Sequence, residues 1–106
     1  MRVYGLKNCD SCRKAMKALP GAELVDVRAE GVPEDVLNRA YAQFGDALLN
    51  TRSTTWRGLD DSTRSAPPLE LIKAHPAVMK RPLIEANDQL FISWNKEVEG
   101  KVKAML

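Results

Sequence analysis

The N-terminal part of the chain alternates between short apolar runs and one helical periodicity. Apolar runs predict strands over residues 2–5 and 24–27. Between them, apolar residues recur at the i, i+3, i+4, i+7 spacing of one helix face: Cys12, Ala15, Met16 and Leu19. Pro20-Gly21 ends that helix. If the helix crosses over in the usual right-handed way, the two strands are parallel and form a βαβ unit.

The middle of the chain holds one clear helical stripe and then loses its periodicity. A helix opens at Gly31-Val32-Pro33 and ends at Gly45, with its apolar positions on one face: Val36, Leu37, Ala40, Tyr41 and Phe44. Residues 46–66 predict a loop or short helices, and a short helix follows over residues 69–74. We therefore expect a helical segment over about residues 31–79.

The C-terminal part predicts a hairpin and one last helix. Residues 83–86 and 89–92 flank the two-residue turn Asn87-Asp88, which favours antiparallel strands. Asn95 can cap a final helix whose apolar side carries four residues: Val98, Val102, Met105 and Leu106. The order βαβ, helices, ββα is that of a thioredoxin-like α/β fold with a mixed four-stranded sheet. We expect one domain over residues 1–106 with a helical insertion.

Composition and charge narrow the possible functions. The chain of 106 residues is 44% hydrophobic, and its formal net charge of +2 is too small to imply a nucleic-acid surface. Neither a signal-peptide pattern nor an eighteen-residue apolar run is present. We expect a cytoplasmic monomer that binds neither nucleic acid nor membrane.

Cys9 and Cys12, the only two cysteines, form a Cys-x-x-Cys motif where the first predicted strand gives way to the helix. The positive end of the helix dipole favours a thiolate at Cys9, and Cys12 belongs to the inward-facing stripe. We therefore expect Cys9 to be the accessible attacking sulfur and Cys12 the more buried one. The alternatives are an unreactive pair or half of a metal site, although His75 is the only histidine.

Four ordered blocks of sequence carry a family resemblance that spans essentially the whole chain. The chain resembles the arsenate reductase-like family that contains ArsC, Spx and YffB, and it is most similar to the YffB branch. The blocks are Asn8-Cys9-Asp10-Ser11-Cys12-Arg13-Lys14-Ala15, Leu48-Leu49-Asn50-Thr51-Arg52, Thr54-Thr55-Trp56-Arg57-Gly58-Leu59-Asp60 and Lys80-Arg81-Pro82-Leu83-Ile84.

The resemblance implies a thiol-dependent oxidoreductase with Cys9 as nucleophile. Arg13 and Arg81 would hold an anionic substrate, Cys12 would be the resolving thiol, and Pro82 would be a cis-proline facing Cys9. Three further residues are expected on the substrate side: Asn8, Arg52 and Arg57. Glutathione would be a co-substrate, and neither a metal nor a tightly bound cofactor is expected.

Two readings of the substrate and role follow from the same resemblance. Family members that reduce arsenate carry a further arginine after the Arg-Pro strand, whereas residues 85–94 contain none, and they have a His-Asn pair where this chain has Gly5-Leu6-Lys7. These departures favour a glutathione-linked thiol or disulfide reductase over an arsenate reductase. Alternatively the chain is similar in role to Spx, a redox-sensing transcription regulator that binds RNA polymerase, and the dithiol is a switch.

Overall fold

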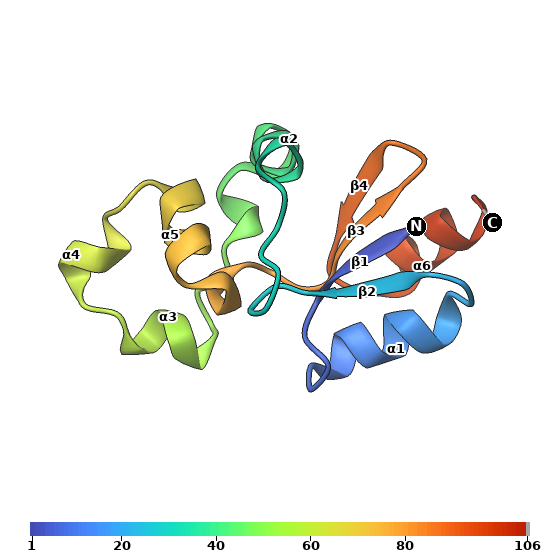
Figure 1. Cartoon of the computed structure of the whole chain (residues 1–106), viewed down its shortest axis with the longest axis horizontal. Helices are drawn as coiled ribbons and strands as arrows, with labels where there is room; N and C mark the ends of the chain where they lie inside the picture. Colours follow the sequence, from blue (N-terminus) through green and yellow to red (C-terminus); the bar gives the residue numbers. More distant parts are fainter. Residues whose placement is uncertain (106) are drawn as a thin grey trace. The chain divides into compact units, whose positions relative to one another are not determined.

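The computed structural model describes residues 1–105, which divide into two compact units. Residues 1–30 and 81–105 form the first, called here the sheet unit, and residues 31–80 form the second, called the helical unit. The helical unit covers the range of the expected insertion to within one residue. Figure 1 shows the elements of both units along the chain.

A four-stranded mixed sheet with the order β2-β1-β3-β4 is the framework of the sheet unit. Its strands are β1 (Arg2–Gly5), β2 (Glu23–Asp26), β3 (Leu83–Ala86) and β4 (Gln89–Ile92). β1 is parallel to β2 and antiparallel to β3, which confirms the expected βαβ unit and mixed sheet. Tyr4 lies opposite Leu83, so the end of β1 meets the beginning of β3.

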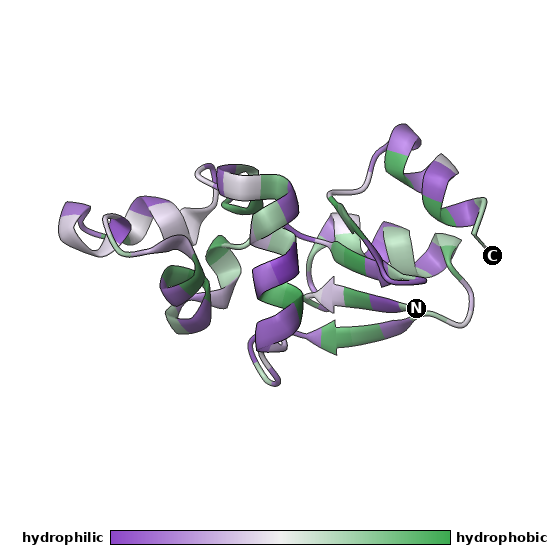
Figure 2. Cartoon of the chain, turned by 90° about the horizontal axis from the view of Figure 1, so that it is seen from above, coloured by the Kyte–Doolittle hydropathy of each residue, from purple (hydrophilic) through white to green (hydrophobic). Residues whose placement is uncertain are grey.

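Two helices of the sheet unit share one core. Helix α1 (Asp10–Ala18) contributes Met16 at its edge and is followed by the buried Leu19, while α6 (Lys96–Lys103) contributes Val102. These side chains pack with Val3 and Ile84 of the central strands. Figure 2 shows green bands of apolar residues between purple ones along the strands, and α6 near the C-terminal end is mostly purple with narrower green bands. Burial of the apolar side of each helix therefore holds it to the sheet.

Local signals for the hairpin and the last helix are confirmed. Asn87 and Asp88 both have positive φ, as a tight hairpin turn requires. The side chain of Asn95 accepts a hydrogen bond of 2.9 Å from the Val98 amide at the start of α6. Two ion pairs also lie along the exposed side of this helix, at 3.0 Å for Glu97/Lys101 and 2.9 Å for Glu99/Lys103. Leu106, which we expected on the buried side of this helix, lies outside the described residues.

The helical unit consists of four α-helices and two 3-10 helices, and backbone hydrogen bonds connect the segment after η1 with the segment after η2. These helices are α2 (Glu34–Phe44), η1 (Gly45–Leu48), α3 (Thr54–Gly58), α4 (Asp61–Arg64), α5 (Pro68–Ala74) and η2 (Pro76–Val78). The Asn50 amide donates to the Val78 carbonyl and the Lys80 amide to the Leu48 carbonyl, both at 2.7 Å. Residues 46–66, for which the sequence predicts a loop or short helices, thus contain most of η1 and all of α3 and α4.

No helix within residues 1–105 combines the length and the apolar character that crossing a bilayer demands.

Candidate active site

Cys9 is the residue immediately before α1 and is partly buried. Its carbonyl accepts the first hydrogen bond of the helix, from the Arg13 amide at 2.9 Å, and its own amide donates to the Leu6 carbonyl at 3.2 Å. This turn fixes the sulfur at the end of the helix where backbone amides point outward. The position is the one that the sequence predicted for the attacking sulfur.

Cys12 lies one turn into α1 and is 1% exposed, so the expected order of burial between the two sulfurs is confirmed. Burial and the hydrogen bond that its thiol donates to Cys9 raise the pKa of Cys12 to about 12. The Leu6 amide donates to the same sulfur and acts in the opposite direction on its pKa, with a smaller effect. Cys12 is therefore a neutral hydrogen-bond donor at ordinary pH.

The pKa of Cys9 is lowered from its ordinary value. Partial burial acts to raise it, but hydrogen bonds from the Cys12 thiol and the Cys12 amide, together with the hydrogen bond and charge of Arg81, outweigh that effect. The net result favours the thiolate, which is the nucleophilic form of cysteine.

Arg81 reaches Cys9 because of the strand order. β3 begins at Leu83, which lies opposite Tyr4 of β1, so the antiparallel register carries Arg81 and Pro82 toward the turn that follows β1. The Arg81–Pro82 peptide bond is cis, as the resemblance implied. Pro82 is buried, and its carbonyl accepts a hydrogen bond of 3.0 Å from the Ser93 amide after β4. The structure thus brings together Cys9, Cys12 and Arg81 from segments distant in the sequence.

Arg13 and Asn8 lie beside this group and have exposed side chains. The Arg13 guanidinium forms a 3.4 Å ion pair with Asp10, and the side chains are 64% and 87% exposed. An exposed pair of this kind contributes little to stability, and it leaves the guanidinium at the surface where an anionic substrate can reach it. Both side chains are therefore exposed to solvent beside the start of α1.

Arg52 and Arg57 belong to the helical unit and are both exposed. Sequence reasoning missed Arg64, which organises the segment around Arg57. Its guanidinium lies 5.7 Å from the centre of the Trp56 ring and donates to the Trp56 and Arg57 carbonyls at 3.1 and 2.9 Å. Trp56 is partly buried under this cation, which fits a role in packing the short helices together.

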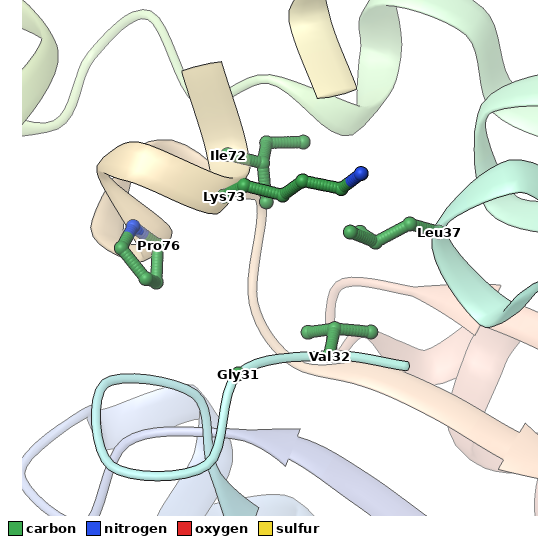
Figure 3. A pocket seen from close by; sticks show the side chains of 6 residues that line it. All are labelled: Gly31, Val32, Leu37, Ile72, Lys73 and Pro76. Carbon is green, nitrogen blue, oxygen red and sulfur yellow. The ribbon is translucent and has the colours of Figure 1, made fainter. Parts of the chain in front are cut away.

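A small hollow of about 110 Å³ lies within the helical unit (Figure 3). Its lining is mainly apolar and comes from the segment before α2, from α2, from α5 and from the start of η2: Gly31, Val32, Leu37, Ile72, Lys73 and Pro76. The Lys73 ammonium forms a 2.8 Å ion pair with Glu34. The hollow therefore offers apolar contact, and its one lining cation already has an acidic partner.

Across residues 1–105, no group of three or more His, Cys, Asp or Glu side chains is arranged to hold a metal ion.

A mixed four-stranded sheet with a parallel βαβ unit, and a cysteine of lowered pKa at the start of its first helix beside Arg81, place this chain in the class of thioredoxin-like α/β folds. The chain belongs to the ArsC family, whose model matches residues 4–102. It is 38% identical over 90% of its length to an uncharacterized protein of Haemophilus influenzae, covering 91% of that protein. It is 27% identical to the global transcriptional regulator Spx of Bacillus subtilis, over 90% of this chain and 80% of the regulator.

Solved structures show the same fold. The YFFB protein matches with a TM-score of 0.85 at 27% identity, covering 95% of this chain and 96% of that chain. An arsenate reductase (ArsC) related protein from Brucella melitensis matches with a TM-score of 0.66 at 28% identity, covering 91% of this chain and 88% of that chain. The thioredoxin-like fold and the resemblance to ArsC, Spx and YffB are thereby confirmed.

Proposed function

We propose that the protein is a glutathione-linked thiol or disulfide reductase in which Cys9 is the nucleophile. The observation that carries this proposal is the hydrogen-bonded, partly buried Cys9 with a lowered pKa, held between the start of α1 and Arg81. A family that includes arsenate reductase-related proteins supports the reaction class.

Thiolate formation alone gives a limited advantage. A thiol with the ordinary pKa of 9.0 is only about 1% ionised at pH 7. Lowering the pKa increases the ionised fraction but also weakens the nucleophile, with a Brønsted slope of about 0.4 to 0.5. The rest of the rate increase comes from positioning of an anionic substrate by Arg81 at the sulfur and by Arg13 at the surface. Stabilisation of the Cys9 thiolate also makes Cys9 a better leaving group in the second step.

The first step is thiol–disulfide exchange. The Cys9 thiolate attacks one sulfur of a substrate disulfide, the Cys9–substrate S–S bond forms, and the substrate S–S bond breaks. The departing half leaves as a thiolate and takes a proton from water. Glutathione disulfide or a mixed disulfide with glutathione has carboxylates that Arg13 or Arg81 of the sheet unit would bind.

Cys12 then resolves the adduct. Two effects that raise its pKa, the hydrogen bond to Cys9 and the negative charge of Cys9, are lost once Cys9 is in a disulfide, and burial remains. The pKa of Cys12 therefore falls in the intermediate where its thiolate is needed. Its sulfur loses a proton and attacks Cys9 Sγ, which forms the Cys9–Cys12 disulfide and releases the bound thiolate. Two glutathione thiols reduce that disulfide and become glutathione disulfide.

A coupled assay with reduced glutathione and a small mixed disulfide tests the proposal. We expect Cys9→Ser to abolish turnover and Cys12→Ser to accumulate the Cys9 mixed disulfide, visible as an added mass on the intact protein. Ser11→Ala, between the two cysteines, is the matched control and should retain turnover. Full activity in Cys9→Ser would refute the assignment of the nucleophile.

Binding of glutathione is a separate measurement. We expect chemical-shift changes in backbone amides around Cys9 and Arg81 when reduced glutathione is added to isotopically labelled protein. Absence of any change at millimolar ligand would argue against glutathione as co-substrate while leaving the nucleophile assignment in place.

The second candidate is a redox-sensing regulator, favoured by the 27% identity to Spx over 90% of this chain. In that role oxidation of Cys9 and Cys12 to a disulfide would change a contact surface for RNA polymerase. Capture of the polymerase α subunit by the reduced or the oxidised protein only, together with no glutathione turnover, would favour this candidate over the reductase.

A further inference from the structure

Gly5 ends β1 and pairs with Asp26 of β2. It is buried, and it is not one of the glycines with positive φ, which are Gly21, Gly31 and Gly45. Its backbone conformation is therefore open to any residue, and flexibility does not explain a glycine here. The explanation has to be the space that a side chain would occupy.

That space is filled by Cys12. A Cβ atom added to Gly5 would overlap Cys12 Sγ, would lie 3.2 Å from Cys12 Cβ, and would be at ordinary contact distance, 3.9 Å, from Leu24 Cδ1. The sulfur is the severe conflict, because it belongs to a short side chain that is 1% exposed and has little room to turn away. Among residues 1–105, the other glycines have nothing within 4 Å of an added Cβ.

The sulfur that rests on Gly5 is held in a chain of hydrogen bonds. The Leu6 amide, next to Gly5, donates to Cys12 Sγ, and the Cys12 thiol donates to Cys9. The direction of the thiol toward Cys9 depends on the sulfur staying close to the strand, beside the Leu6 amide. A sulfur displaced from Gly5 loses the donor behind it and its alignment with Cys9.

We propose that Gly5 is a positioning residue that admits Cys12 Sγ against the end of β1 and so directs the Cys12 thiol onto Cys9. This role of Gly5 rests on the proposed function, in which Cys9 is the reacting sulfur. The test of Gly5 does not require the natural substrate. Gly5 acts through Cys12 and does not touch the substrate.

The test is a double-mutant cycle read by the rate at which Cys9 is alkylated by iodoacetamide at neutral pH, with the modified residue identified by peptide mass. We expect Gly5→Ala to slow alkylation of Cys9 severalfold, because a displaced Cys12 thiol no longer stabilises the thiolate. Cys12→Ala should slow it by a similar factor. In the Cys12→Ala background, Gly5→Ala should have little further effect, since no thiol remains to be displaced.

A stability measurement keeps the proposal testable if Gly5→Ala folds poorly. We expect a lower denaturation midpoint for Gly5→Ala and recovery of most of that loss in Gly5→Ala/Cys12→Ala, where only the milder 3.2 Å contact with the Cβ of residue 12 persists. Gly100→Ala, in α6 of the same unit with open space around its Cβ, is the matched control and should leave Cys9 alkylation unchanged.

Additive effects of Gly5→Ala and Cys12→Ala on alkylation, or a folded Gly5→Ala with wild-type reactivity of Cys9, would overturn the proposal. These outcomes are independent of glutathione turnover. A failed reductase assay with an intact coupling between Gly5 and Cys12 would refute the proposed function alone.

Discussion

The Cys12 thiol donates a hydrogen bond to Cys9, and the pKa values of the two sulfurs are displaced in opposite directions by it. The accessible sulfur of Cys9 at the start of α1 becomes easier to ionise. The buried sulfur of Cys12 has a pKa of about 12 and therefore keeps its proton at neutral pH. One negative charge is thus placed on the sulfur that a substrate can reach.

Stability should depend on pH with opposite signs for the two cysteines. Because the folded pKa of Cys9 lies below its ordinary value of 9.0, its contribution is fully present above pH 9.0 and is lost as the pH falls through the folded pKa. The folded pKa of Cys12 is raised, so its contribution is present below 9.0 and is lost as the pH rises toward about 12.

Urea unfolding at a series of pH values measures both effects. The free-energy difference between wild type and Cys9→Ser should grow with rising pH up to about 9, the ordinary value. Wild type should lose stability above that pH more steeply than Cys12→Ala does. A pH-independent difference between wild type and Cys9→Ser would contradict the lowered pKa of Cys9.

Removal of the Arg81 side chain should raise the pKa of Cys9, since Arg81 contributes both a hydrogen bond and a positive charge to the thiolate. At a pH below the pKa, each unit by which the pKa of Cys9 rises reduces its thiolate fraction by about tenfold. We expect Arg81→Ala to show the larger rise and Arg81→Lys a smaller one, because lysine keeps the charge without the planar donor.

The effect of Arg81 on the pKa of Cys9 is measured by titrating the thiolate absorbance in a Cys12→Ala background, where Cys9 is the only cysteine. Arg28→Ala, an exposed arginine of the same unit, is the control and should leave the titration unchanged. An equal shift in both variants would show that overall charge, rather than contact with Arg81, governs Cys9.

Arg64→Ala should destabilise the helical unit by about 1–2 kcal/mol, because it removes a stacking contact on Trp56 and two hydrogen bonds to carbonyls at the end of α3. Hydrogen exchange of the amides in α3 and α4 measures the local loss. Lys73→Ala breaks only an exposed ion pair with Glu34 and should cost less than about 1 kcal/mol. Equal protection in the two variants would contradict the role given to Arg64.

Asn95→Ala should cost about 1 kcal/mol of unfolding free energy, since its side chain satisfies the Val98 amide at the start of α6. Asn95→Asp keeps an acceptor and adds a charge favoured by the helix dipole, so it should retain the wild-type midpoint. Thermal unfolding followed by circular dichroism provides the measurement. Wild-type stability in Asn95→Ala would show that packing alone, through residues such as Val102, holds α6 in place.

Local sequence patterns were sufficient for most elements of the sheet unit. The stripe from Cys12 to Leu19 gave α1, and the turn Asn87-Asp88 gave the hairpin of β3 and β4. Residues 46–66 resisted such reasoning because α3 and α4 are very short and depend on caps at Ser53 and Asp60 rather than on an apolar stripe. Sequence patterns did not single out Gly5, although a glycine in a strand can mark close approach of another group to the backbone.

The sequence by itself determined the strands, the helices that have an apolar stripe and the place of Cys9 just before a helix, because each depends on neighbours within a few positions along the chain. Only the tertiary structure decided that Arg81 acts on Cys9, that Gly5 supports Cys12, and that the two cysteine pKa values diverge. These relationships arise where β3 pairs with β1 and where α1 packs against the end of β1. Such contacts depend on strand order and burial, and neither can be predicted from the spacing of residues that are close in the sequence.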